Sequence, residues 1–264
     1  MTSFQKKPLH EKTIIFALLA LLFFFALIKI FSYFSLSNAV AKRDMSRVKL
    51  LLKLGLDVNA KNRKTGMPLP IFLAVGDDDK NLLDLLIAYG ADINSKDGEG
   101  TTVLEYAIRL NKKLAAKLLV EKGAKLDDCD LYLAARGNNT ELIELLLAKG
   151  LDVNAACHPS SLKILPENEY LSTPLYAAIL TDSSEAADVL IDHGAIVNLK
   201  KNNNYSPLHA AASMRARKTM KLLISRGAKI NTKDQEGHTP LYYATKTEDI
   251  ELQQTLITAG AIRN

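Results

Sequence analysis

The stretch Ser206-Pro207-Leu208-His209-Ala210-Ala211-Ala212 decides the fold. A proline at this point fixes its own φ angle and gives up only an N–H that the start of a helix leaves unpaired. An amphipathic run continues to Gly227, and glycine is the residue expected where a chain leaves a helix in the left-handed conformation. The stretch therefore predicts a turn followed by a pair of helices that closes at Gly227.

The same unit recurs with a constant internal spacing. The distance from the proline position to the closing glycine is 20 residues in six units: 70→90, 103→123, 130→150, 174→194, 207→227 and 240→260. Counting 20 residues back from Gly55 reaches Ser35, where a seventh unit is predicted to begin. Length varies only between units, where the steps from glycine to proline position are 15, 13, 7, 24, 13 and 13 residues.

These units resemble ankyrin repeats, whose signature T-P-L-H-x-A recurs about every 33 residues. Pro-Leu-(His/Tyr)-x-Ala and a following Gly-Ala-x-x-x-Asn recur in phase, the first at Pro174, Pro207 and Pro240 and the second from Gly90 to Asn94 and from Gly227 to Asn231. The resemblance covers roughly residues 35–264. It implies an all-α ankyrin-repeat solenoid of about seven helix-turn-helix repeats with short β-turn fingers, in which the first and last repeats act as caps.

Three features depart from the repeat pattern. The glycine usual between the two helices is replaced by residues that tolerate left-handed geometry or cap a helix, namely Asp78, Asn111, Asn138 and Asp182. The connection 124–130 is too short for a full finger, which predicts a break in the row of fingers. The connection 157–171 is enlarged, and it is either a binding loop or a neutral insertion.

Residues 14–34 form an uninterrupted apolar run except for Lys29, after a basic flank at residues 1–13. As a helix the run is about 31 Å long, which is enough to cross the hydrocarbon core. It predicts a transmembrane signal anchor, and Lys29 either reaches the interface or pairs with an acid in a partner's membrane helix. A cleavable signal peptide is the alternative, because Ala39-Val40-Ala41 matches an A-x-A cleavage pattern.

Orientation follows from the charges beside this run. Lys6, Lys7 and Lys12 precede it, which favours a cytoplasmic N-terminus and repeats on the far side, the periplasm in a bacterium. Five basic residues after the run oppose this assignment: Lys42, Arg43, Arg47, Lys49 and Lys53. We therefore expect a single-pass membrane protein whose sidedness stays open.

The chain carries little that indicates chemistry. Thirty basic and 28 acidic residues follow residue 35, a near-balance that argues against nucleic acid as the main partner. No phosphate-binding, dinucleotide or serine-nucleophile motif is present, so we expect no catalytic residues, no cofactor and no metal. The acidic run Asp77-Asp78-Asp79 is interpreted as a loop and helix cap, and a Cys129–Cys157 disulfide would form only in an oxidising compartment.

The resemblance implies that the chain binds another protein on the concave surface made by the fingers and the first helices, as a monomeric stack. Family positions give these candidate partner-binding residues: Arg63, Lys64, Met67, Glu99, Thr101, His158, Leu162, Ile164, Tyr170, Leu180, Asn203, Tyr205, Met214, Glu236 and His238. His209 occupies the position of the family histidine, which bonds to neighbouring loop backbone. Such a module acts either as a scaffold that holds a partner near the membrane or as an inhibitor or immunity protein. The basic cluster on residues 215–229 is either a solvated face or a site for an acidic partner or anionic lipid.

Overall fold

The structure, a computed structural model, describes residues 19, 21–24, 36–60, 69–157, 173–200 and 203–263. Most of the predicted transmembrane run 14–34 therefore lies outside the described residues. The part that is described, Leu19 and residues 21–24, is helical and exposes its large apolar side chains. Within the described residues no helix has the length and apolar character needed to cross a membrane.

The described helices come in consecutive pairs, as the spacing predicts. Residues 36–41 are helical and precede α2 (Met45–Lys53). The pairs that follow are α3 (Pro70–Gly76) with α4 (Lys80–Ala88), α5 (Val103–Arg109) with α6 (Lys113–Glu121), α7 (Asp128–Arg136) with α8 (Thr140–Ala148), α9 (Pro174–Leu180) with α10 (Ser184–Asp192), α11 (Pro207–Ser213) with α12 (Arg217–Ser225), and α13 (Pro240–Lys246) with α14 (Ile250–Thr258). The chain divides into two compact units, residues 1–92 and 93–264.

Local sequence sets where these helices begin and end. Ser206 caps α11 by accepting the backbone N–H of His209, and Thr173 caps α9 in the same way through the N–H of Tyr176. Both helices have proline at their first position. The closing glycines all have φ between 80° and 97°, which confirms the predicted left-handed exits at Gly55, Gly90, Gly123, Gly150, Gly194, Gly227 and Gly260.

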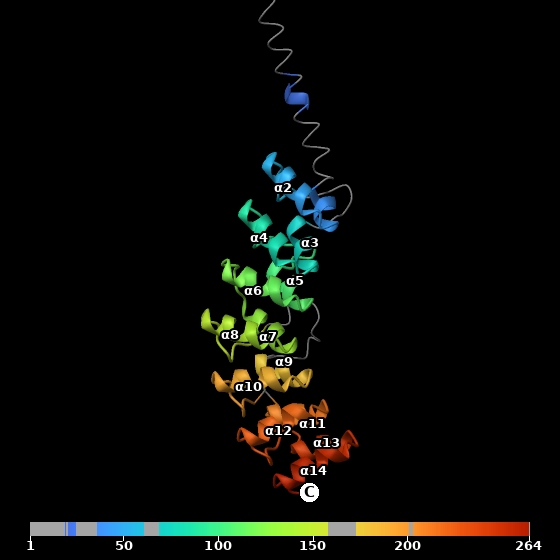
Figure 1. The fold of residues 1–264 in the computed structure, drawn as a ribbon. Coiled ribbons are helices and arrows are strands. Elements are labelled where there is room, and N and C mark those ends of the chain that lie inside the picture. The colour runs from blue at the N-terminus through green and yellow to red at the C-terminus, as the bar shows by residue number, and fades with distance from the viewer. Residues whose placement is uncertain are drawn as a thin grey trace, which may run out of the picture. The chain divides into compact units, whose positions relative to one another are not determined.

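The second unit is a stack of two layers of helices (Figure 1). The first helices of successive pairs contact one another, α5 with α7, α7 with α9, α9 with α11 and α11 with α13, and the second helices α6, α8, α10, α12 and α14 do the same. The core lies between the layers, where Leu142, Ile143 and Leu146 of α8 are fully buried. Burying a side chain of this size contributes about 1.5–3 kcal/mol. The all-α architecture is thus confirmed.

The turns between paired helices adopt the left-handed conformation at the predicted positions. Asp78, Asn111, Asn138 and Asp182 have φ between 50° and 55°. Arg43, Arg215 and Glu248 occupy the same position in other pairs with φ from 54° to 57°, so the position imposes the conformation even on residues poorly suited to it. Asn138 and Asp182 also reach the next pair: their side-chain oxygens accept the N–H groups of Ala186 in α10 (3.0 Å) and Thr219 in α12 (2.8 Å).

An asparagine four residues after the closing glycine links successive pairs. The amide of Asn198 donates to the carbonyl of Gly227 (3.1 Å) and accepts the N–H of Lys229 (2.9 Å). The same two bonds are made by Asn59 to Gly90 and Asp92, by Asn154 to Gly194 and Ile196, and by Asn231 to Gly260 and Ile262. We call these contacts the asparagine bridges.

The bridge is replaced at the seven-residue connection. Asp127 occupies the asparagine position and instead forms a capping box with Asp130 at the start of α7. As a result α7 begins at Asp128, two residues before the predicted start. A disulfide between Cys129 and Cys157, with Cα atoms 4.6 Å apart, ties this helix start to the first residue of the enlarged connection.

Candidate functional site

The structure describes some of the predicted partner-binding residues and leaves out others. Eight fall in the described part of the chain: Glu99, Thr101, Leu180, Asn203, Tyr205, Met214, Glu236 and His238. The other seven lie outside it: Arg63, Lys64, Met67, His158, Leu162, Ile164 and Tyr170. The enlarged connection at 158–172 is therefore untested as a binding loop.

The finger at residues 96–102 is organised by Asp97. Its carboxylate accepts the N–H groups of Glu99 (2.8 Å) and Thr101 (2.9 Å), and Lys96 and Thr102 close the turn in an antiparallel bridge. Glu99 is exposed at the tip. Thr101 is only 7% exposed, so little of it is available to a partner, and its predicted contact stays a prediction.

Two predicted contacts lie at the ends of first helices. Met214 follows the last residue of α11 and is 52% exposed, whereas Leu180 ends α9 and is half-buried. Both lie at the opposite end of their helix from the finger, about 10 Å away for a helix of seven residues. Tyr205 spans this distance, since its hydroxyl donates to Ser213 (2.7 Å) at the end of α11.

The structure brings Tyr205 and His238 together through two tyrosines of α13. Tyr205 lies edge-on to Tyr243 (ring centroids 5.3 Å apart), and Tyr243 lies edge-on to Tyr242 (5.4 Å). His238 stacks face to face on Tyr242 with centroids 3.7 Å apart and ring planes 4° apart. We call Tyr205, His238, Tyr242 and Tyr243 the aromatic surface.

His209, which is fully buried, holds the backbone next to this surface in place. Its Nδ1 accepts the backbone N–H of Ser206 (3.1 Å), so Nε2 carries the proton and donates to the carbonyl of His238 (3.1 Å). Burial is the main cause that lowers the pKa of His209. The predicted bond from the family histidine to a neighbouring loop is confirmed, and it fixes the finger that carries His238.

Asp234 fixes the same finger from its start. The carboxylate accepts the N–H groups of Glu236 and His238 (both 2.9 Å) and the hydroxyl of Tyr243 (2.6 Å). Burial and then this bond to Asp234 raise the pKa of Tyr243. Burial disfavours the charge on Asp234, but the donors from Tyr243 and the backbone outweigh it and lower the pKa of that carboxyl. Tyr243 is therefore a neutral donor held in one orientation.

Neighbouring fingers are joined by a backbone bond. The N–H of Gln235 donates to the carbonyl of Asn203 (2.9 Å), while the side chain of Asn203 accepts the N–H of Tyr205. The side chain of Asn203 thus stabilises the turn of its own finger. The side chain of Glu236 is 76% exposed beside His238, with its carboxylate 3.2 Å from Nδ1.

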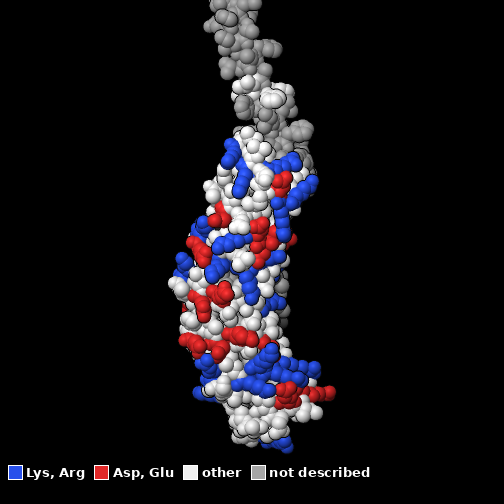
Figure 2. All heavy atoms as spheres, viewed as in Figure 1, with Lys and Arg blue, Asp and Glu red and all other residues white. Residues whose placement is uncertain are grey.

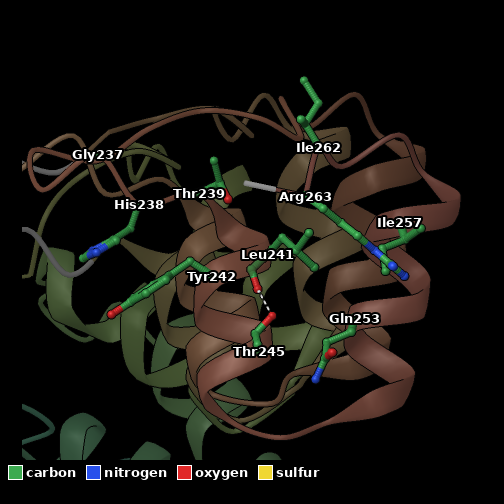
Figure 3. A pocket seen from close by; sticks show the side chains of 10 residues that line it. All are labelled: Gly237, His238, Thr239, Leu241, Tyr242, Thr245, Gln253, Ile257, Ile262 and Arg263. Atoms are coloured by element: carbon green, nitrogen blue, oxygen red, sulfur yellow. Dashed lines mark hydrogen bonds between the residues drawn. The ribbon is translucent and has the colours of Figure 1, made fainter.

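A pocket of about 500 Å³ opens next to the aromatic surface (Figure 3). His238 and Tyr242 form one wall, and side chains of α14 and the C-terminal segment face them, among them Gln253, Ile257 and Arg263. The bond from Thr245 to the carbonyl of Leu241 (2.9 Å) lies within its lining. The lining mixes the apolar side chains of Leu241, Ile257 and Ile262 with polar ones, among them Thr245, Gln253 and Arg263.

The basic cluster on α12 is largely paired with acids. Arg217 binds Asp249 (2.8 Å) and Glu251 (3.2 Å), Lys221 binds Glu251 (2.9 Å), and Arg226 pairs with Asp188 and Asp192. Figure 2 shows blue and red side chains next to one another over the C-terminal half of the described chain. Because neighbouring pairs supply the countercharges, the solvated-face interpretation is favoured over an anion site.

The acidic run at residues 77–79 has a structural role. Asp79 caps α4 through the N–H of Leu82 (3.0 Å), Asp78 forms the left-handed turn, and Asp77 pairs with Arg43 (2.8 Å). Among the residues that the structure describes, no group of three or more His, Cys, Asp or Glu side chains is arranged to hold a metal.

Sequence reasoning missed Tyr242 and Tyr243 as site residues. Tyr242 occupies the position in α13 that His209 holds in α11, and it is 41% exposed. The signal was available, because Pro240-Leu241-Tyr242-Tyr243 places two tyrosines at the start of a first helix, one helical turn from the finger.

The comparisons with known proteins agree with this geometry. A model of ankyrin repeats in three copies matches residues 36–130, 71–157 and 131–234. The ankyrin repeat domain-containing protein SAT10 of Stachybotrys chartarum is 32% identical over 163 residues, which are 60% of this chain and 8% of that protein. The human transient receptor potential cation channel subfamily A member 1 is 27% identical over 61% of this chain and 14% of the channel.

A solved structure shows the same fold. The crystal structure of the human ASB11 ankyrin repeat domain superposes with a TM-score of 0.70 and 24% identity, covering 87% of this chain and 99% of that one. The matched part of this chain spans only 8% and 14% of the length of these two curated relatives. With paired helices, left-handed glycine exits and the histidine bond in place, this chain belongs to the ankyrin repeat family.

Proposed function

We propose that this chain binds another protein on the finger side of its first helices, with the aromatic surface at the centre of the contact. The observation that carries the proposal is the stacked and edge-on arrangement of Tyr205, His238, Tyr242 and Tyr243. Aromatic side chains are enriched at protein interfaces and among the residues that dominate binding energy. Ankyrin repeats are a general protein-interaction module, and among the described residues this surface is the one where aromatic rings cluster.

The surface is fixed before binding. Tyr243 is held by Asp234, the finger by His209 and Asp234, and Tyr205 by Ser213. A partner therefore meets rings that lose little conformational freedom, which reduces the entropic cost of association. Glu236 at the edge provides a charge that favours a basic rim on the partner.

The finer architecture is part of the same proposal. We take the seven helix pairs among the described residues as seven repeats, in a monomeric stack that acts without catalysis or cofactor. Residues 14–34 anchor it as a single-pass membrane protein. The length of the apolar run and the exposed Phe23 and Phe24 support the anchor, because an unprotected apolar helix is unfavourable in water.

The repeats face an oxidising compartment in this proposal, which is the periplasm if the host is a bacterium. The Cys129–Cys157 disulfide supports this side of the membrane, since such bonds persist outside the reducing cytosol. A reporter fused after residue 264 and assayed in both compartments tests it. Activity restricted to the cytoplasmic side would overturn the orientation.

The binding proposal is tested by site-specific photo-crosslinking in the native host. A photoreactive amino acid at Tyr242 is expected to capture one protein, whereas the same group at Lys149, exposed at the end of α8 in the other layer, is expected not to. Capture of the same protein from both positions, or from Lys149 alone, would contradict the finger side as the binding surface. Deleting the gene then separates scaffold from inhibitor, since loss of the partner's localisation marks the first and self-intoxication the second.

A further inference from the structure

The first described helix pair has an uncovered face that later pairs bury. Eight residues before the closing glycine, the side chain is buried in the later pairs, at Leu82, Leu142, Ala186, Thr219 and Leu252. Leu252 is buried although it belongs to the last described pair, which no described pair follows. The position is therefore covered by the preceding pair, as it is for Leu82 in the second pair. In α2 the same position is Arg47, which is exposed.

Two leucines share this face of α2 with Arg47. Leu50 and Leu54 follow at spacings of three and seven residues, which place all three side chains on one side of the helix. Leu50 is 57% and Leu54 63% exposed. The residues equivalent to Leu50 are half-buried in later helices, at Leu85, Leu145, Val189 and Leu222. The greater exposure of Leu50 thus reflects that no helix pair precedes α2 among the described residues, whereas Leu54 stands at a position that is also exposed in later pairs, at Tyr89, Lys122 and Arg226.

The charged side chains within α2 are all basic. No acidic residue occurs in Met45–Lys53, and Lys49 and Lys53 flank the leucines. Asp44, just before the helix, is used as its cap, and Arg43 is paired with Asp77. In Figure 2 the N-terminal part of the described chain shows more blue than red. We call Arg47, Lys49, Leu50, Lys53 and Leu54 the basic leucine face.

We infer that the basic leucine face lies on the surface of a bilayer that contains anionic lipid. Leucines that enter the headgroup region, flanked by lysines that stay at the phosphates, are the composition of an interfacial helix. A second copy of this chain is disfavoured as the occupant, because two such faces would bring like charges together. The inference rests on the proposed anchor for nearness to a membrane, since the apolar run ends at residue 34, shortly before Met45.

The test is hydrogen exchange on the full chain embedded in lipid nanodiscs. We expect amides of Met45–Lys53 to exchange more slowly in discs with anionic lipid than in zwitterionic discs, while those of α8 exchange equally in both. Salt at about 1 M shortens the screening length to about 3 Å and should remove the difference. Each basic residue near an anionic surface strengthens attachment about fivefold, so Lys49→Gln with Lys53→Gln should weaken it about 25-fold and also abolish the difference.

Matched variants separate surface contact from helix stability. Lys113→Gln with Lys149→Gln removes the same charge from exposed sites elsewhere and should leave the lipid effect intact. Leu50→Ser with Leu54→Ser should abolish the lipid effect, whereas Leu110→Ser with Leu114→Ser, at two other exposed leucines, should preserve it.

Failure of this inference is distinguishable from failure of the anchor. Equal exchange of α2 in anionic and zwitterionic discs, in a chain that resists extraction by alkaline carbonate, would overturn the inference and leave the anchor standing. If carbonate releases the chain, the anchor is wrong, and co-sedimentation with anionic vesicles decides the inference by itself. Binding that requires Lys49 and Lys53 would then support it, and no binding would overturn it.

Discussion

The pairs α11–α14 and the start of α7 join their neighbours in different ways. Between α11–α12 and α13–α14 the contacts are many and weak: the bridge from Asn231 to the residues after α14, the histidine bond from His209 and the finger bond from Gln235 to Asn203. At the start of α7 the finger is absent, Asp127 caps its own helix, and one covalent bond joins Cys129 to Cys157.

This difference shows how a repeat protein tolerates irregular connections. In a solenoid, stability comes from each repeat and from its contacts with its neighbours, so a junction that loses a bridge needs a substitute. The fully connected end, in turn, holds the aromatic surface in a fixed arrangement. The junction at α7 therefore relies on a covalent bond, whereas the pairs α11–α14 rely on repeated hydrogen bonds between repeats.

The largest expected effect comes from removing the disulfide. It closes a loop with a sequence separation of 28 residues, for which the chain-entropy model gives about 3–4 kcal/mol. Cys129→Ser with Cys157→Ser should lower the melting temperature and speed hydrogen exchange in α7 and α9, while α13 and α14 keep their protection. Reductant should do the same to the natural chain and nothing to the double variant. Unchanged exchange in α7 would contradict the substitute role.

The second effect concerns Asp130, which is 4% exposed at the same junction. Burial raises the pKa of its carboxyl to about 7, while the unfolded value is about 3.9. The folded chain therefore prefers the protonated form, and stability should fall as pH rises from about 4 to about 7. Asp130→Asn keeps an acceptor for the N–H of Asp127 and removes the charge.

We expect this variant to be more stable than the natural chain at pH 8, by about 2 kcal/mol, and nearly equal to it at pH 4. The measurement is urea unfolding of both proteins across this pH range. Parallel stability curves would show that Asp130 does not titrate between the two values.

A smaller effect is predicted for a single asparagine bridge. Asn198→Ala removes two hydrogen bonds to the next pair, at Gly227 and Lys229, and should cost about 1.5 kcal/mol. Exchange should accelerate where α10 meets α12. Asp127→Ala, at the matching position, should instead loosen the start of α7 at a cost of about 1 kcal/mol. If both variants loosened the same elements, the distinction between bridge and cap would fail.

The smallest effect is a gain in stability. Thr219 in α12 is fully buried, and its hydroxyl has no hydrogen-bond partner among the described residues, although its backbone N–H donates to Asp182. Thr219→Val replaces the hydroxyl by a methyl group of similar size and should stabilise the chain by about 1 kcal/mol in thermal unfolding. Thr255→Val is the control, because that hydroxyl donates to Glu251 and lies at the surface. A loss of stability in Thr219→Val would contradict the missing partner.

Much of the fold follows from local sequence signals, and less of the site does. Pro174, Pro207 and Pro240 each begin a helix as predicted, because proline placement and glycine exits depend on nearby backbone geometry. The early start of α7 depends on a capping box that its short connection permits, and the disulfide depends on how adjacent pairs stack. Neither is determined within a single repeat.

The site shows the same limit. Tyr205 and His238 were predicted as site residues from family positions. Their contact through Tyr242 and Tyr243 could not be predicted, because it depends on how far apart two successive fingers lie. Thr101 was predicted in the same way, yet it is only 7% exposed. Exposure of individual side chains depends on neighbouring repeats, so position in the repeat alone does not fix it.

The most direct test of the central claim is a hydrogen-exchange footprint of the captured partner on the full chain. We predict slower exchange in residues 203–206 and 234–243, with α8, α10 and α12 unchanged. Tyr242→Ala should weaken binding by tenfold or more, as expected for an interface anchor worth over about 1.4 kcal/mol. A footprint confined to α8, α10 and α12, with full affinity in Tyr242→Ala, would contradict the assignment of the aromatic surface as the binding site.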